Sequence, residues 1–388
     1  MTIQQIPQYT MICGDLLNQP EAVAQSLDTC HLKGTEVFMD EVHARTLSLF
    51  NSPEELEALA ERLAALKVKR LHCSYWAWPT ALLTQNRFAF AVEAMGGEEA
   101  VRDYYGNLTG AHLYDRWCQE YELACKLDAQ AYTFHLIDYA PIDGRWDFKI
   151  PVSDIRQAMV YMIQRLLNEL DARNLLTENS PRIELENAGY GLEYGMQDAP
   201  DAAFVLDQLY DPHNKVCLAW EINHLLHATG VDKQTGLGMF MLPEDEKTDA
   251  MRRIEARNLD AQGLCTAWVI ENLLDPRTIH HVGAVHLSDC VAKETAYFVR
   301  GRLVEPWSSE LDALPSWEDM EEYGVNIVLR DYDSHVPMGT NGALDIERIK
   351  DALNTLATQN DDFVILHELK NEADILDAVA KQQAVMNL

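Results

Sequence analysis

The chain has 388 residues, of which 47% are hydrophobic, so it can bury a large core. Its 62 acidic and 31 basic residues give a formal net charge of −31, which opposes binding to nucleic-acid phosphate and to anionic membranes. The eight cysteines form no C-x-x-C pair, the first residues lack a signal peptide, and no apolar run reaches the length of a membrane span. These features favour a soluble, reduced, cytoplasmic protein.

Short apolar runs typical of buried strands alternate with longer amphipathic stretches along the chain. We predict eight strands, at Thr10–Cys13, Glu36–Met39, Arg70–Cys73, Ala131–His135, Arg182–Glu186, Val216–Trp220, Val282–His286 and Phe363–Leu366. Helices are predicted between them, including Pro20–Thr29, Pro53–Leu66, Ile155–Arg173 and Ile346–Thr358. Eight βα units in one chain are typical of a TIM barrel.

An open, doubly wound sheet shows the same alternation of strands and helices and is the alternative fold. The barrel is favoured because polar candidates lie at or just after the carboxyl ends of six different strands, and a closed ring brings so many strand ends together. We therefore predict a single α/β domain, a (β/α)8 barrel over residues 1–388. Long loop insertions on its C-terminal face are predicted at approximately residues 77–130, 231–281 and 290–330.

Nine side chains suited to divalent metals occur in order along the chain, most of them at the ends of predicted strands: His72, His135, Glu186, Glu221, His224, His286, Asp333, His335 and Glu368. Imidazole and carboxylate ligands suit zinc, manganese, cobalt and iron. A single histidine or glutamate at a strand end is more often a core residue or a salt-bridge partner. Five histidines in this ordered arrangement favour a metalloenzyme with one to three divalent ions per chain.

Local spacing pairs several of these candidates. Glu184 and Glu186 share one face of a strand because side chains alternate with period two, and Glu186 is the preferred ligand because it ends the strand. Glu184 is expected to face the barrel interior beneath it. Glu221 and His224 have an E-x-x-H spacing that places both on one helical face, where a strand turns into a helix.

Together these segments resemble the xylose-isomerase-like TIM-barrel superfamily, which includes endonuclease IV and many sugar or sugar-phosphate isomerases and epimerases. The specific parts are the E-x-x-H after the sixth strand, His286-Leu287-Ser288-Asp289 at the seventh, and the loop Asp333-Ser334-His335-Val336-Pro337-Met338-Gly339. The resemblance implies a shared metal site formed by Glu186, Glu221, His286 and Glu368. Glu221 stands where most members carry Asp, and this longer ligand is expected to shift the metal.

Similarity to endonuclease IV implies further ligands for a three-metal cluster: His72 and His135 with bridging Glu186, then His224, Asp333 and His335. The chain departs from the repair enzymes at two places. It reads His72-Cys73-Ser74-Tyr75 without their continuation from Tyr to Asn, and Gly189-Tyr190-Gly191 comes one residue early relative to their glycine motif.

The resemblance favours a divalent-metal-dependent sugar or sugar-phosphate isomerase or epimerase that works through an enediolate. One ion would stabilise the enediolate charge, with Glu186 and Glu368 as base and acid. Trp76 or Trp78 is a candidate to stack on a sugar face, although wall packing is the commoner role of such residues.

The alternative is an endonuclease IV-like multi-zinc phosphate-ester hydrolase (AP endonuclease family 2). The net charge opposes a DNA substrate, whereas a small phosphorylated metabolite meets no such objection. A third class is a metal-binding scaffold without catalysis, which the Glu186 and Glu368 pair argues against. The expected partner is therefore a small polyhydroxy or phosphorylated substrate, with no nucleic acid and no membrane. A homo-oligomer is an expectation from the superfamily.

Overall fold

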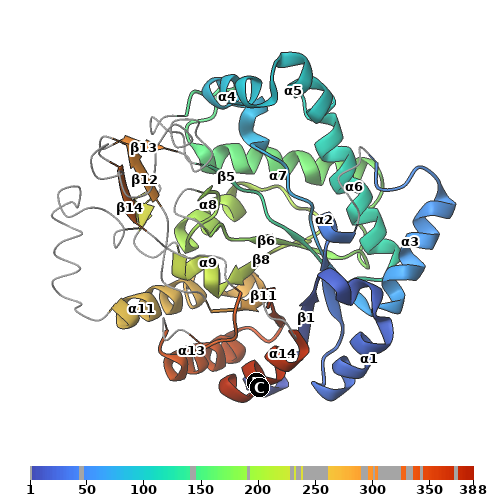
Figure 1. The fold of residues 1–388 in the computed structure, drawn as a ribbon, viewed down its shortest axis with the longest axis vertical. Coiled ribbons are helices and arrows are strands. Elements are labelled where there is room, and N and C mark those ends of the chain that lie inside the picture. Colours follow the sequence, from blue (N-terminus) through green and yellow to red (C-terminus); the bar gives the residue numbers. More distant parts are fainter. Residues whose placement is uncertain are drawn as a thin grey trace.

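A computed structural model describes the following residues of the chain: 2–42, 48–139, 146–189, 193–227, 231–232, 237–238, 261–289, 296–299, 302–304, 325–328, 335–340, 344–370 and 375–388. Eight parallel strands close into a barrel in the order β1-β15-β11-β8-β6-β4-β3-β2 (Figure 1). They are β1 (Gln8–Ile12), β2 (Thr35–Phe38), β3 (Val68–His72), β4 (Ala131–Phe134), β6 (Arg182–Glu186), β8 (Val216–Glu221), β11 (Val282–Leu287) and β15 (Val364–His367). The predicted barrel is confirmed, and the ends of every predicted strand are correct to within two residues.

A helix follows each barrel strand along the chain, and these helices surround the barrel in Figure 1. They are α1 (Pro20–Thr29), α3 (Pro53–Ala65), α6 (Ala111–Lys126), α7 (Ile155–Ala172), α8 (Ala199–Gln208), α11 (Ala261–Leu273), α13 (Ile346–Gln359) and α14 (Ile375–Met386). Several begin where a side-chain oxygen accepts a hydrogen bond from the backbone N–H three residues ahead, as Ser52, Asp154, Asp198 and Asp345 do. Among the described helices, none has the length and apolar character needed to cross a membrane.

The three long intervals hold more than insertions, because α6 falls within 77–130 and α11 within 231–281. The first interval adds η3 (Pro79–Leu82), α4 (Gln85–Met95) and α5 (Glu98–Tyr105), and the last two helices lie together beside the barrel in Figure 1. The third adds a small antiparallel sheet of β12 (Ala296–Val299), β13 (Arg302–Val304) and β14 (Val325–Val328). Shorter elements complete the described chain: η1 (Ile3–Gln5), η2 (Gly14–Asn18), α2 (Met39–Val42), β5 (Asp138–Tyr139), β7 (Glu193–Tyr194), α9 (Ile222–His227), β9 (Val231–Asp232), β10 (Leu237–Gly238) and η4 (Ile279–His281).

A charged cluster, here called the interior triad, consists of Arg70, Glu36 and Glu184 and is at most 1% exposed to solvent. Arg70 Nε donates to Glu36 Oε2 at 2.9 Å, while its two Nη atoms contact the Glu184 carboxylate. Burial disfavours the guanidinium cation, but the charges of Glu184 and Glu36 outweigh burial and raise the pKa of Arg70. Glu184 therefore faces the interior as expected, where it pairs with Arg70 of β3, and Arg70 in turn pairs with Glu36 of β2.

Beside the triad, the Thr133 hydroxyl donates to Glu36 Oε2 at 3.2 Å, and a mainly apolar cluster fills another part of the described interior. Tyr9, Ala219, Ala284, Val364 and Leu366 form a buried cluster separate from the main core between barrel and helices. Because strand side chains alternate, several members lie two residues before a candidate ligand and hence one layer beneath it. The interior triad and this cluster together close the barrel beneath the ends of the strands.

Candidate metal centre

The carboxyl ends of the barrel strands bring eight of the nine candidate ligands together. They form three groups, and within each group the potential ligand atoms all lie within 4.8 Å of one another. We name them the His72 group (His72, His135, Glu186), the central group (Glu186, Glu221, His286, Glu368) and the His335 group (Glu221, His224, His335). The ninth candidate, Asp333, lies outside the described residues, as does the side chain of His227.

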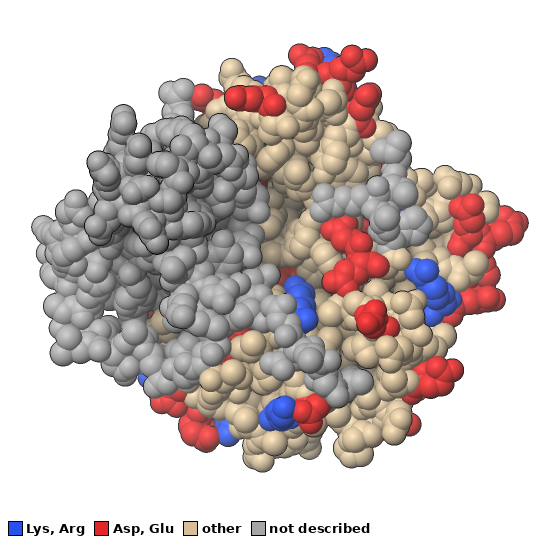
Figure 2. All heavy atoms as spheres, in the orientation of Figure 1, with Lys and Arg blue, Asp and Glu red and all other residues tan. Residues whose placement is uncertain are grey.

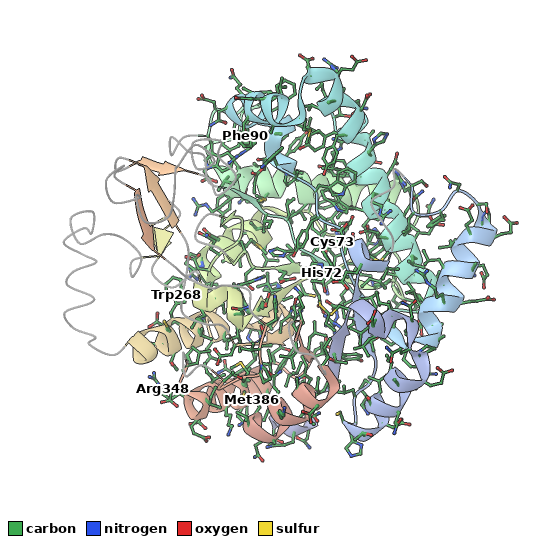
Figure 3. The ribbon with its side chains drawn as sticks, viewed as in Figure 1. His72, Cys73, Phe90, Trp268, Arg348 and Met386 are labelled. Atoms are coloured by element: carbon green, nitrogen blue, oxygen red, sulfur yellow. The ribbon has the colours of Figure 1, made fainter. Side chains whose placement is uncertain are left out.

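The His72 group joins the ends of β3, β4 and β6. His72 Nε2 lies 2.9 Å from Glu186 Oε2, and Nδ1 donates to the carbonyl oxygen of Cys73 at 3.0 Å. That backbone bond fixes the ring so that its other nitrogen faces the carboxylate. His135 Nδ1 lies 3.8 Å from Glu186 Oε1 and 2.8 Å from the Tyr75 hydroxyl. Figure 3 places His72 near the middle of the ribbon, away from its outer helices.

The central group contains three carboxylates and one histidine, each at most 2% exposed. His286 Nδ1 lies 2.8 Å from Glu368 Oε2, and its buried Nε2 has no hydrogen-bond partner among the described residues. Burial and the charge of Glu368 raise the pKa of Glu221. Burial lowers the pKa of His286, but the hydrogen bond to Glu368 and the charges of Glu186 and Glu368 raise it to about 9. The group therefore favours a bound cation, and its mixed N and O donors suit a divalent metal.

The His335 group extends the centre from Glu221. Glu221 is the last residue of β8 and His224 lies in α9, so the E-x-x-H pair straddles a strand end instead of sharing a helix. His224 Nδ1 nevertheless lies 2.8 Å from Glu221 Oε2. His335 Nδ1 lies 3.2 Å from Glu221 Oε1, and a φ of +44° places His335 in the left-handed region. A Cβ at Gly189 would meet His224 Cδ2 at 2.4 Å, so glycine permits this approach of the two segments.

Four contacting residues were missed by the sequence reasoning. Asn187 exchanges two hydrogen bonds with the backbone of Glu221, and its own carbonyl oxygen lies 2.8 Å from His224 Nδ1. Ser288 Oγ donates to Glu221 Oε1 at 3.2 Å. Lys370 and Tyr75 contact Glu368 and His135, respectively. The available signal was proximity in sequence, because each lies one to three residues after a candidate ligand.

Trp76 and Trp78 belong to the wall beside the centre. The ring centroid of Trp76 lies 5.2 Å from that of Tyr104 in α5, and that of Trp78 lies 4.9 Å from that of Phe90 in α4. Figure 3 labels Phe90 in the outer helical layer, apart from His72. Packing accounts for both tryptophans, and stacking on a sugar stays a prediction.

Comparison with known proteins bears on the fold. No family model and no curated protein matches the sequence. Similar solved structures include a D-tagatose 3-epimerase-like protein, with 11% identity, a TM-score of 0.50, and coverage of 98% of this chain and 97% of that one. Endonuclease IV from Thermus thermophilus has 15% identity, a TM-score of 0.48 and coverage of 98% and 99%. A xylose isomerase-like TIM barrel protein from Mycobacterium smegmatis, solved with magnesium, has 9% identity, a TM-score of 0.45 and coverage of 100% and 97%.

The fold of this chain is a (β/α)8 barrel, similar to that of the D-tagatose 3-epimerase-like protein over nearly the full length of both chains. At such low identities the likeness concerns the fold alone, and one fold of this kind supports many reactions. The reaction therefore has to be argued from the residues of the three ligand groups.

Proposed function

We propose that this chain is a metal-dependent hydrolase that cleaves a phosphate ester of a small molecule at a cluster of three divalent ions. The observation that carries the proposal is the sharing of carboxylates between groups. Glu186 belongs to both the His72 group and the central group, and Glu221 belongs to both the central group and the His335 group. An isomerase with one ion needs the central group alone, so it leaves the two flanking groups without a comparable role.

The charge of the described site supports an anionic substrate. Three carboxylates and the ammonium of Lys370 give it a formal charge of −2. One divalent ion would bring this charge to zero, whereas three would reverse it to +4. Lys370 is 28% exposed at its side chain, and its Nζ lies 2.7 Å from Glu368 Oε1. A positive cluster with a reachable ammonium at its edge suits a phosphoryl group better than a neutral sugar.

In this proposal, each part of the site has its own role. Divalent ions bound there would polarise the phosphoryl oxygens and lower the pKa of bound water. The His72, central and His335 groups would hold these ions, and Tyr75, Asn187 and Ser288 would orient the ligands that they contact. Lys370 would bind a phosphoryl oxygen at the exposed edge, while the interior triad and the apolar cluster close the barrel below.

A small substrate is favoured over DNA by the charge of the whole chain. The formal net charge is −31, and Figure 2 shows clusters of acidic side chains along the visible rim, with fewer basic ones between them. A protein that follows a nucleic-acid backbone needs basic side chains to neutralise phosphates. The described residues of this face offer a poor surface for a long polyanion.

The first test is metal content per chain, measured by mass spectrometry on protein purified without chelator or affinity nickel. Three ions in the wild type, and fewer in His72→Gln, are expected. His213→Gln is the matched control, because His213 is a partly exposed histidine outside the three groups that also contacts a carboxylate, 3.0 Å away on Asp171. Hydrolysis would be followed with p-nitrophenyl phosphate, its bis-ester and abasic-site DNA. One ion per chain and no hydrolysis with saturating zinc or manganese would overturn the proposal.

The second candidate is the sugar or sugar-phosphate isomerase or epimerase, for which the central group is the supporting observation. Glu186 and Glu368 lie in one group with His286 and Glu221, so two carboxylates are available to remove and return a proton. The test is exchange of solvent deuterium into a panel of sugars and sugar phosphates. Exchange by a protein that holds one ion per chain would favour this candidate over hydrolysis.

A further inference from the structure

We propose that Gln382 is a positioning residue of the metal centre, a single buried amide that fixes three ligand-bearing segments at once. The inference rests on the proposed metal site but concerns a residue far from the ligands in sequence. Gln382 lies on α14, the helix after the last barrel strand, and its exposed fraction is 0%. Its role follows from where each of its hydrogen bonds goes.

The Gln382 amide makes three hydrogen bonds, and all three go to segments that carry candidate ligands. Oε1 accepts from the backbone N–H of Met338 at 2.9 Å. Nε2 donates to the carbonyl oxygen of Leu287 at 3.0 Å and to His367 Nδ1 at 2.8 Å. These bonds use both amide hydrogens and the oxygen, so the orientation of the side chain is determined.

Each of these three partners neighbours a candidate ligand. Leu287 directly follows His286, His367 directly precedes Glu368, and Met338 lies three residues after His335. One side chain therefore connects the ends of β11 and β15 and the 335–340 loop, which supply ligands to the central and His335 groups.

The tautomer of His367 extends this connection to the first strand of the barrel. Because His367 Nδ1 accepts from Gln382, Nε2 carries the proton and donates to Gln8 Oε1 at 3.0 Å. Gln8 begins β1, so the histidine next to Glu368 is held from two sides.

The 335–340 loop depends on this amide more than the strands do. β11 and β15 are fixed by their parallel ladder, in which His286 is opposite Leu366. On the loop, Val336 exchanges two backbone hydrogen bonds with Asp289, and Gly339 N–H donates to Asp289 Oδ2 at 3.0 Å. Gln382 adds an anchor from α14 between these two points. Without it, Met338 N–H would be buried without a partner, and the loop carrying His335 would shift to reach water. Leu287 C=O would keep the hydrogen bond that it accepts from Glu368 N–H at 3.3 Å.

The expected effect is a selective loss of metal affinity. Removing a group that orients a metal ligand typically costs about 10- to 100-fold in affinity. Gln382→Met keeps the length of the side chain and removes the amide, so it should weaken binding at the His335 group by about this factor. Binding at the central group should change less, because its ligands lie at the ends of strands. The measurement is competition between the protein and a chromophoric chelator for zinc.

Asn360 provides a matched control. Its Nδ2 donates to the carbonyl oxygens of Ile279 and Val282 at 2.9 and 2.8 Å, and its Oδ1 accepts from Asp362 N–H at 3.0 Å. Asn360→Leu thus removes the same number of hydrogen bonds at the opposite end of β11. We expect it to lower the melting temperature without changing zinc affinity, whereas Gln382→Met changes both. Equal zinc affinity in Gln382→Met and the wild type would overturn the inference.

A metal-free measurement separates this inference from the proposed function. Amide hydrogen exchange at Val336 and Gly339 should become faster in Gln382→Met, although both amides donate to Asp289 and not to Gln382. Unchanged exchange at both amides would refute the positioning role, whatever metal the wild type binds. If exchange is faster in Gln382→Met and the wild type binds one ion, the result would support the role of Gln382 and contradict the three-ion proposal.

Discussion

Replacing Arg70 tests whether the interior triad stabilises the barrel through charge compensation or through packing alone. Its guanidinium lies between the carboxylates of Glu36 and Glu184, and all three side chains are at most 1% exposed. Arg70→Met retains much of the aliphatic volume and removes the cation. Two carboxylates are then left buried side by side without an opposite charge.

The magnitude follows from the burial of the interior triad. Removing one partner of a buried ion pair typically costs about 3–5 kcal/mol, because the remaining charge is uncompensated. For 388 residues, an unfolding entropy of roughly 2.1 cal/mol/K per residue amounts to about 0.8 kcal/mol/K. The melting temperature of Arg70→Met should therefore fall by about 4–6 °C.

Differential scanning calorimetry at pH 7, on metal-free protein, measures this change. A triple variant, Arg70→Met with Glu36→Gln and Glu184→Gln, removes every charge of the triad and should recover much of the loss. Arg102→Met is the control, since Arg102 pairs with Glu98 on the surface and both side chains are about half exposed. Such surface pairs contribute about 0–1 kcal/mol. A melting temperature of Arg70→Met equal to that of Arg102→Met, or a triple variant no more stable than Arg70→Met, would refute the reasoning.

Three further predictions concern the site. Lys370→Met should weaken inhibition by inorganic phosphate about tenfold, because a charge-assisted hydrogen bond is lost, and inhibition kinetics on the metal-loaded enzyme would measure it. Gly189→Ala should displace His224, whose Cδ2 would lie 2.4 Å from the new Cβ, and metal analysis should then show loss of an ion. Tyr75→Phe removes the hydroxyl 2.8 Å from His135 Nδ1 and should weaken one zinc site about tenfold in a chelator competition.

Each of these predictions has an outcome that contradicts it. Lys350, which pairs with Glu347 on α13, provides the control for Lys370. If Lys350→Met weakens phosphate inhibition as much as Lys370→Met does, Lys370 acts only through its contribution to the net charge. Full metal content in Gly189→Ala would mean that the segments around residues 189 and 224 can move apart without loss of metal binding. Unchanged zinc affinity in Tyr75→Phe would leave its hydroxyl without a role in holding His135.

The fold, and most of the side chains that the three groups bring together, could be predicted because both depend on local patterns. An apolar run that ends in a histidine or glutamate, repeated along the chain, indicates a strand end at the catalytic face of a barrel. Glu221 shows the limit of such patterns. The E-x-x-H spacing suggested two helical residues, yet the strand continues through Glu221 because its backbone still pairs with His286 of β11.

The supporting contacts could not be predicted from the sequence because they join distant segments. Glu36 meets Arg70 only once β2 and β3 are aligned in register. In the sequence, Gln382 resembles an ordinary polar residue of an amphipathic helix. Its exposed fraction of 0% depends on how α14 packs over the barrel end. Local periodicity gives no information on contacts of this kind.

In the proposed three-ion site, the sharing of Glu186 and Glu221 between groups would link the metal positions thermodynamically. The central group offers four ligands, three of them anionic, and should fill at the lowest free-ion concentration. An ion entering a flanking group must use a carboxylate that already neutralises a neighbour, and it is repelled by that neighbour's charge. Occupancy would then rise in steps as free metal increases. The chemistry available to this polypeptide would depend on the ion supply of its surroundings as well as on its own residues.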